Sequence, residues 1–259
     1  EAYLDVTENK TGNPSATLIA KEIRQKIKDK TGLTASAGIS INKFLAKVAS
    51  DHNKPNGQKT INPEDVIGFL EHLDIRKFYG VGKVTAKKMY GLGIFTGKEL
   101  KTKDLDFLTA HFGKSGTFFY NVVRGIHLSD VKPKRTPKSM GAERTFNENL
   151  SSEVFMLDKL AHIAQELGRR TSRSNIAGKT ITLKIKYSDF TLQTRSKTLP
   201  YFVADQSLIF DTAKTLLYQS PLLNSVRLLG ISLSKLNTEK KKATANEPQS
   251  LAVQLKFDF

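Results

Sequence analysis

The apolar residues of the first 75 positions are spaced as short strands that alternate with helices. Residues 1–7 and 33–41 are predicted to be strands. The helix between them is expected to begin at Asn13-Pro14-Ser15, and its apolar side chains recur every three to four positions. Because no earlier strand would protect the edge of a sheet that begins at Glu1, we expect this segment to be part of a larger α/β domain.

A second helix is predicted after Asn42, a residue type that caps helix N-termini. Its buried side would consist of Phe44, Leu45, Val48 and Ala49. The run Lys54-Pro55-Asn56-Gly57 has the composition of a turn. A short strand near Ile61 and a helix from Pro63 are expected to follow.

Residues 76–131 are predicted to form a small all-helical unit, because short apolar segments are separated there by glycines. The stretch from Phe78 to Ala86 contains Gly80-Val81-Gly82 between two predicted helices. Backbone N–H groups in such a hairpin can approach a phosphate closely, and the next helix N-terminus adds a partial positive charge. The same pattern also fits an ordinary helix–helix turn, so the motif alone leaves both interpretations open.

Residues 132–138 are predicted to be a stiff, solvated linker, since they combine two prolines with four positive charges. After them, residues 139–236 follow the order strand, helix, strand, strand, helix, strand. This order is typical of the ferredoxin-like fold. Residues 237–250 are polar and contain three consecutive lysines, which predicts disorder, and the chain then ends on an apolar stretch.

Two neighbouring strands of this last unit carry basic side chains at alternate positions. Thr182, Lys184 and Lys186 alternate with apolar residues, and Gln193, Arg195 and Lys197 alternate along the next strand. We expect the two sets to share one basic face that could meet phosphates, with the helices on the apolar face. A merely solvated face is the alternative.

The net charge of the chain is the strongest indication of its binding partner. The chain has 259 residues, with 41 Lys and Arg against 25 Asp and Glu, which gives a formal net charge of +16 and a pI near 9.8. Such an excess indicates a polyanionic partner, and nucleic acid is the first candidate. There are no cysteines, which excludes disulfides, thiol nucleophiles and Cys-ligated metals. No stretch approaches the length of a membrane span, so we expect no membrane partner.

Several stretches, taken together and in this order, resemble the Y-family of translesion DNA polymerases, most closely the DNA polymerase IV branch. The family's catalytic strand contains the run Glu-Ala-Tyr-Leu-Asp, which here occupies residues 1–5. Similar stretches follow at residues 38–51, at Lys54-Pro55-Asn56-Gly57, at Gly80-Val81-Gly82, at residues 138–141 and at residues 195–200. The resemblance spans nearly the whole chain.

The resemblance implies a multidomain α/β and α+β protein. Residues 1–75 would be the C-terminal part of the palm, 76–131 the helix-hairpin-helix thumb, 132–138 the linker, 139–236 the little finger and 237–259 a disordered tail. It also implies the reaction: deoxynucleotides (dNTPs) are added to a primer on damaged template DNA with the help of two Mg²⁺ ions.

The resemblance further implies roles for single residues. Glu1 would be a catalytic carboxylate and metal ligand, and Lys54 would contact the incoming triphosphate. The expected DNA contacts are Gly80, Gly82, Lys83, Thr85, Lys138, Ser139, Lys184, Lys186, Arg195, Lys197 and Arg227. Gln254, Leu255, Phe257 and Phe259 resemble the short peptide by which bacterial polymerases bind the sliding clamp. A monomer in the bacterial cytoplasm is expected.

One departure from the family bears on activity. The family also has an aspartate before the counterpart of Glu1, a first palm strand with its own aspartate, and a fingers subdomain, and this sequence contains none of them. We therefore expect the chain as given to bind primer–template DNA without extending the primer. The alternatives are a non-catalytic DNA- and clamp-binding protein and an RNA-binding structural protein, neither of which needs a palm.

Overall fold

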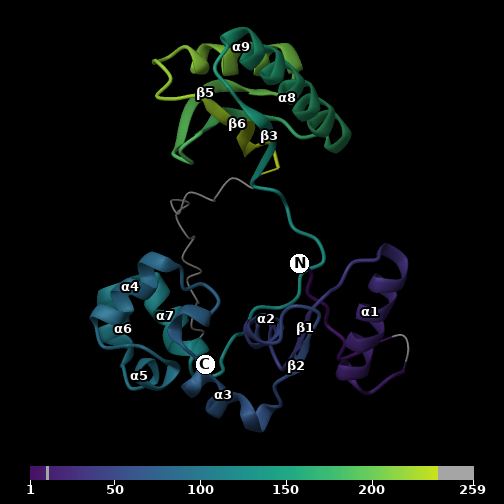
Figure 1. Cartoon of the computed structure of the whole chain (residues 1–259), viewed down its shortest axis with the longest axis vertical. Helices are drawn as coiled ribbons and strands as arrows, with labels where there is room; N and C mark the ends of the chain where they lie inside the picture. Colours follow the sequence, from purple (N-terminus) through teal and green to yellow (C-terminus); the bar gives the residue numbers. More distant parts are fainter. Residues whose placement is uncertain (10–11, 239–259) are drawn as a thin grey trace, which may run out of the picture. The chain divides into compact units, whose positions relative to one another are not determined.

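The structure is a computed structural model that describes residues 1–9 and 12–238. It divides into two compact units, Glu1–Pro133 and Lys134–Phe259, and the division falls inside the predicted basic linker. Figure 1 shows the helices and strands of each unit. No helix in the described part of the chain is long and apolar enough to cross a membrane.

The first unit is mainly helical and contains a two-stranded parallel sheet. Its α-helices and strands are α1 (Ala16–Thr31), β1 (Ala37–Ile39), α2 (Lys43–His52), β2 (Gln58–Thr60), α3 (Val66–His72), α4 (Lys83–Gly91), α5 (Gly97–Lys101), α6 (Leu105–Phe112) and α7 (Lys114–Val122). Two short 3₁₀ turns, Pro63–Asp65 and Ile75–Lys77, flank α3. The predicted helix starts are confirmed: Ser15 caps α1, and the Asn42 side chain accepts the backbone N–H of Leu45 at 3.0 Å.

One hydrophobic core extends from α2 to the end of α7. It begins with the four apolar residues that were predicted to form the buried side of α2, and it continues to Val123 just after α7. The boundary predicted at residue 75 therefore does not separate two cores, because α2 and the later helices bury their apolar sides against one another.

Two predicted strands of the first unit are corrected. Residues 1–7 form no strand, since within the described residues they pair with no neighbouring strand and a strand is defined by such pairing. The strand predicted over residues 33–41 is reduced to Ala37–Ile39, the three residues that lie opposite β2.

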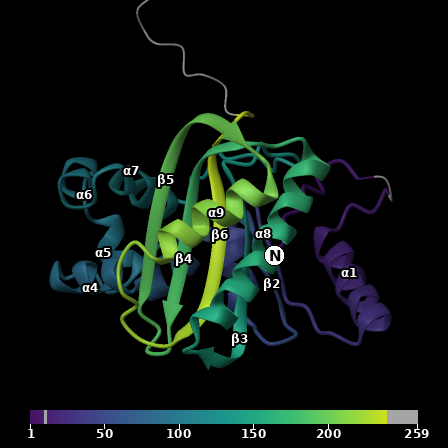
Figure 2. The same cartoon turned by 90° about the horizontal axis from the view of Figure 1, so that it is seen from above.

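The second unit has the predicted order of elements: β3 (Ser139–Leu150), α8 (Glu153–Ser174), β4 (Gly178–Tyr187), β5 (Leu192–Val203), α9 (Gln206–Leu217) and β6 (Val226–Leu236). Its four strands form one antiparallel sheet in the order β3-β6-β4-β5. Helices α8 and α9 pack on the same side of this sheet (Figure 2). The mixed α/β and α+β fold class is thereby confirmed.

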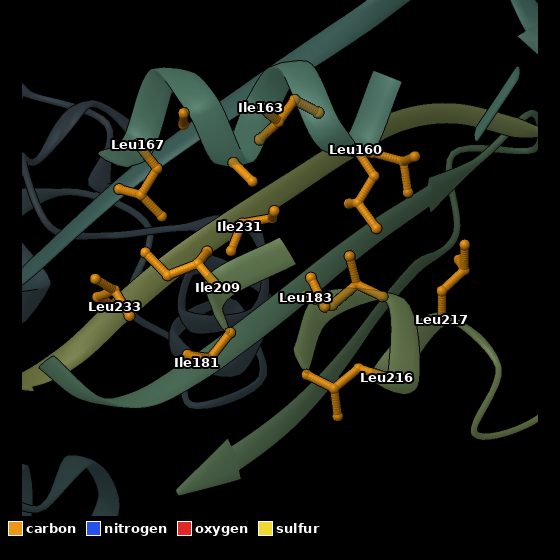
Figure 3. Packing of buried hydrophobic residues seen from close by; sticks show 14 of the residues in the cluster. Leu160, Ile163, Leu167, Ile181, Leu183, Ile209, Leu216, Leu217, Ile231 and Leu233 are labelled. Carbon is orange, nitrogen blue, oxygen red and sulfur yellow. The ribbon is translucent and has the colours of Figure 1, made fainter. Parts of the chain in front are cut away.

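The core of the second unit lies between these helices and the sheet. Leu160, Ile163 and Leu167 of α8 and Ile209 and Leu216 of α9 point toward the strands in Figure 3. They meet Ile181 and Leu183 of β4 and Ile231 and Leu233 of β6. Each of these four strand residues is at most 1% exposed. The alternation along β4 thus places its apolar residues on the helix-covered face, as predicted.

The register of β5 corrects the predicted basic face. Gln193, Arg195 and Lys197 lie directly opposite Ile185, Leu183 and Ile181 of β4. Directly opposite residues point to the same side of a sheet, so these three belong to the helix-covered side and not to the open face. Alternation within one strand gives two faces, but only the pairing between strands tells which face is which.

Arg195 in particular has no role on an open surface, because only 7% of it is exposed. Its guanidinium donates to the backbone carbonyls of Leu216 at 2.9 Å and Leu217 at 2.6 Å, at the C-terminus of α9, and to Gln193 Oε1 at 3.1 Å. A cation at this end of a helix also compensates the helix dipole. Arg195 is therefore a structural residue, and its predicted contact with DNA is wrong.

The open face of the sheet is rich in hydroxyl groups. Thr180 is hydrogen-bonded to Thr198, and Thr182 to Ser196, each at 2.9 Å. Lys184 lies on this face but pairs with Glu143 at 2.8 Å across Gly230, whose missing side chain leaves room for the pair. The face is thus more neutral than the sequence pattern predicts.

Replacing Arg195 by alanine tests its structural role. Arg195→Ala leaves the last carbonyls of α9 without their charged donor, and we expect it to lower the free energy of unfolding by about 2–3 kcal/mol. Thermal or urea denaturation measures this change. Lys197→Ala, two positions away on the same strand and exposed, is the control and should change stability little. A loss of DNA binding at unchanged stability would contradict the assignment.

Candidate functional site

A chain of ion pairs connects the two residues predicted to act on the nucleotide. Lys47 Nζ lies 3.0 Å from Glu1 Oε2 and 3.2 Å from Asp51 Oδ2. Asp51 Oδ1 in turn lies 2.5 Å from Nζ of Lys54. Lys47 and Asp51 are four residues apart on α2, on the side away from its buried residues, so one helix face brings Glu1 and Lys54 together.

These contacts shift the pKa values of the groups involved. The hydrogen bond from Lys47 lowers the pKa of Glu1, and the same bond raises the pKa of Lys47. Burial raises the pKa of Tyr3 to about 12, with a further contribution from its hydrogen bond to Glu1. Glu1 is therefore held as a carboxylate beside a protonated lysine and a neutral phenol.

The turn that carries Lys54 is held by Arg24 of α1. The Arg24 guanidinium donates to Asn56 twice, to its backbone oxygen at 2.6 Å and to Oδ1 at 3.0 Å. It also donates to the backbone oxygen of Ala35 at 2.9 Å, and to Gln58 Oε1 at 3.4 Å. A planar donor group with several N–H bonds can fix the turn, the segment before β1 and the start of β2 at once.

The glycine that ends this turn is required by packing. A Cβ atom on Gly57 would lie 1.7 Å from the backbone oxygen of Asn53. Asn56 adopts a left-handed conformation with φ of 49°, which asparagine tolerates better than most residues. The turn was predicted from its asparagine and glycine, and the backbone geometry and packing of the turn explain why these residue types occur there.

The carboxylates of this region do not fit a pair of Mg²⁺ ions by themselves. Glu1 offers oxygen donors of the type that Mg²⁺ prefers. Within residues 1–9 and 12–238, however, no group of three or more His, Cys, Asp or Glu side chains could hold a metal ion. Glu1 can supply one ligand only, whereas a site for two ions needs several carboxylates.

The glycine hairpin of the first unit presents free backbone donors. Phe78 is buried and anchors it, whereas Gly80 has φ of 92°, a conformation in which other residues are strained. Gly82 occupies the N-cap position of α4, but no side chain there accepts a hydrogen bond from the N–H groups of the first turn. That turn also has no acidic residue. Gly80, Gly82 and Lys83 are exposed and Thr85 is half-buried. The Val81 N–H is bonded to the Phe78 carbonyl at 3.0 Å, so the groups open to an anion are the N–H groups of the first turn of α4.

The predicted DNA contacts of the second unit are spread over its sheet. Lys138 and Ser139 are exposed where β3 begins, and Lys184 and Lys186 project from the open face of β4. Arg227 is the extra residue of a bulge in β6, between the pairs Tyr187–Val226 and Lys186–Leu228. Gln254, Leu255, Phe257 and Phe259, the predicted clamp-binding residues, lie outside the described residues.

Sequence reasoning missed the residues that organise the site. Lys47 and Asp51 were part of the family-like stretch, and their spacing of four along a predicted helix was a signal that they share a face. Arg24 had no such signal, because its partners lie 11, 32 and 34 positions away in the sequence.

We expect Arg24→Ala to loosen the Lys54 turn without unfolding the unit. Loss of charge-assisted hydrogen bonds worth about 1.5–3 kcal/mol should speed amide hydrogen exchange by roughly 10- to 100-fold at Gly57, whose N–H bonds to Ser36 Oγ, and at Ala37, whose N–H bonds to the Gly57 carbonyl. Exchange mass spectrometry measures this effect. Lys26→Ala, on the same helix and paired only with exposed Glu22, is the control. Unchanged protection in Arg24→Ala would contradict the role of this side chain.

Three family models match consecutive parts of the chain. They are the impB/mucB/samB family over residues 1–51, the IMS family HHH motif over residues 63–94 and the impB/mucB/samB family C-terminal domain over residues 137–247. The second match includes the hairpin at Gly80–Gly82, which supports its interpretation as a helix-hairpin-helix motif.

Curated relatives match over nearly the full chain. DNA polymerase IV 2 of Agrobacterium fabrum is 49% identical over 96% of this chain and 70% of its own length. DNA polymerase IV of Leptospira interrogans is 47% identical over 93% of this chain and 69% of its own length. The solved structure of a Y-family DNA polymerase chimera superposes with a TM-score of 0.72 at 26% identity, covering 91% of this chain and 69% of the chimera. The chain belongs to the impB/mucB/samB family of Y-family DNA polymerases, as its motifs predicted.

Proposed function

We propose that this chain is the part of a translesion DNA polymerase that grips the backbone of primer–template DNA and faces the incoming nucleotide. DNA-directed DNA polymerase is the enzyme class of its family. In this proposal the first unit contributes the carboxylate Glu1, the triphosphate lysine Lys54 and the hairpin at Gly80–Gly82. The second unit contributes the open face of its sheet.

The observation that carries the proposal is the uncapped N-terminus of α4 behind this hairpin. N–H groups without a side-chain cap, a following lysine and the positive end of the helix dipole together favour a phosphate oxygen. None of these groups reads a base, which suits an enzyme that must bind any sequence. The net charge of +16 adds a sequence-independent attraction to DNA.

Contacts of the second unit are proposed at Lys138, Ser139, Lys184, Lys186 and Arg227. Hydroxyl groups on the open face can donate to phosphates without adding charge, and those of Thr180 and Thr182 lie on the same face of β4 as Lys184 and Lys186. Lys197 lies at the exposed edge strand on the helix side, so we propose at most a peripheral contact for it.

The proposal includes chemistry with two Mg²⁺ ions and dNTP substrates. It also includes a monomeric state, a cytoplasmic location and binding of the sliding clamp through Gln254, Leu255, Phe257 and Phe259. Glu1 would supply one oxygen ligand to the Mg²⁺ ions, whose chemistry would be activation of the primer hydroxyl group and stabilisation of the leaving pyrophosphate. Lys47 would then serve to orient the Glu1 carboxylate, and Asp51 to orient Lys54.

Gly82→Asp separates DNA binding from stability. A Cβ atom at Gly82 meets nothing within 4 Å, and an aspartate at an N-cap should leave the stability of α4 equal or raise it by about 0.3–1 kcal/mol. The same carboxylate would occupy the free N–H groups and repel phosphate. We expect the affinity for duplex DNA, measured by fluorescence anisotropy, to fall about 10- to 100-fold.

The matched control is Gly91→Asp, which adds the same charge at the other end of α4, where a Cβ atom also meets nothing within 4 Å. It should change the affinity far less than Gly82→Asp does. Equal losses in the two variants would mean that only net charge matters, and the hairpin would then have no specific role.

Primer extension tests the catalytic part of the proposal. Because one carboxylate cannot hold two metal ions, the 259-residue chain should bind a primer–template with a recessed 3′ end but add no nucleotide to it in the presence of Mg²⁺ and dNTPs. Gel electrophoresis of a labelled primer detects the product. Incorporation by this chain would contradict the expectation, whereas failure to bind DNA at all would contradict the proposed function.

A further inference from the structure

An exposed phenylalanine stands at the tip of the hairpin between β4 and β5. Phe190 has φ of 67° and 61% of it is exposed to solvent. Its backbone N–H bonds to the Tyr187 carbonyl at 3.0 Å, which closes a tight turn, and the Thr191 carbonyl accepts the Tyr187 N–H at 2.9 Å. In three-residue hairpin loops of this kind the left-handed position is normally taken by glycine or asparagine.

This position is unfavourable for phenylalanine on two counts. A bulky residue at positive φ is a conformational outlier, and an aromatic ring on the surface loses the benefit of burial. Neither feature helps the hairpin to form. Strained residues that fold stability does not explain are often functional.

Two cations lie close to the ring. Lys186 Nζ lies 4.8 Å and the guanidinium carbon of Arg227 lies 5.0 Å from the ring centroid. The bulge in β6 makes Arg227 the unpaired extra residue, which is how strands redirect a side chain. Among the described residues, neither cation forms an ion pair with a carboxylate.

An exposed aromatic ring beside two cations that form no ion pair matches the chemistry of single-stranded nucleic acid. Unpaired bases stack on aromatic side chains irrespective of their sequence, while Lys and Arg meet the adjoining phosphates. Paired bases of a duplex are already stacked on their neighbours, so the ring offers them nothing.

We propose that Phe190, with Lys186 and Arg227, is a stacking site for an unpaired base of the template strand. The inference rests on the proposed function in one respect, namely that the ligand is template DNA.

Tryptophan fluorescence provides a direct test, because the chain contains no tryptophan. In the full-length Phe190→Trp variant the new indole is the sole reporter, and we expect a short oligodeoxythymidylate to quench it by stacking. The control is Phe155→Trp on α8, at a residue that is also 61% exposed and lies on a helix that covers the other side of the sheet. Quenching of neither variant, or of both equally, would overturn the proposal.

Phe190→Gly tests the same site by loss of the ring. Since glycine favours positive φ, the variant should keep or raise the melting temperature. We expect it to bind a primer–template with a 5′ template overhang about 5- to 100-fold more weakly than the original chain, while its affinity for blunt duplex stays unchanged. Equal affinity for the overhang substrate would overturn the proposal.

The two proposals fail in distinguishable ways. If the unsubstituted chain does not bind blunt duplex DNA, the proposed function fails, whatever happens at Phe190. If duplex binding is normal and responds to Gly82→Asp, but Phe190→Gly binds the overhang substrate as tightly as before, only the stacking site is refuted.

Discussion

The pairing of β4 with β5 determines what the second unit can present to a partner. Leu183 lies opposite Arg195, so a whole row of polar side chains on β5 turns toward α9 and the hydroxyl row turns outward. A shift of one residue would exchange the two faces. Arg195 helps to prevent such a shift, because its bonds to the carbonyls at the end of α9 form only when it lies on the inner face.

In the first unit, one helix performs two tasks with opposite sides. The apolar side of α2 is part of the core that joins it to the later helices, and its polar side connects Glu1 to Lys54 through Lys47 and Asp51. Arg24 of α1 holds the turn that carries Lys54. Since the site is supported by the same helix as the core, its geometry depends on the packing of the whole unit.

Local patterns in the sequence predicted the elements well, and contacts between distant residues were harder to foresee. Asn42 and the apolar residues behind it identified α2, and the order of elements after residue 138 identified the sheet. The strand predicted at residues 1–7 failed because strands depend on partners, which a local pattern does not contain. The face predicted for Arg195 was wrong for a related reason, since register is a property of two strands. The role of Arg24 could not be predicted because its partners lie up to 34 positions away in the sequence.

The neutral character of the open sheet face has a consequence for binding thermodynamics. Each phosphate neutralised by Lys or Arg releases condensed counterions, whereas contacts from hydroxyl groups and backbone amides release none. Lys184 is already paired with Glu143, and the rows beside it are Thr and Ser. The affinity of this chain for DNA should therefore decline less steeply with salt concentration than its formal charge of +16 suggests.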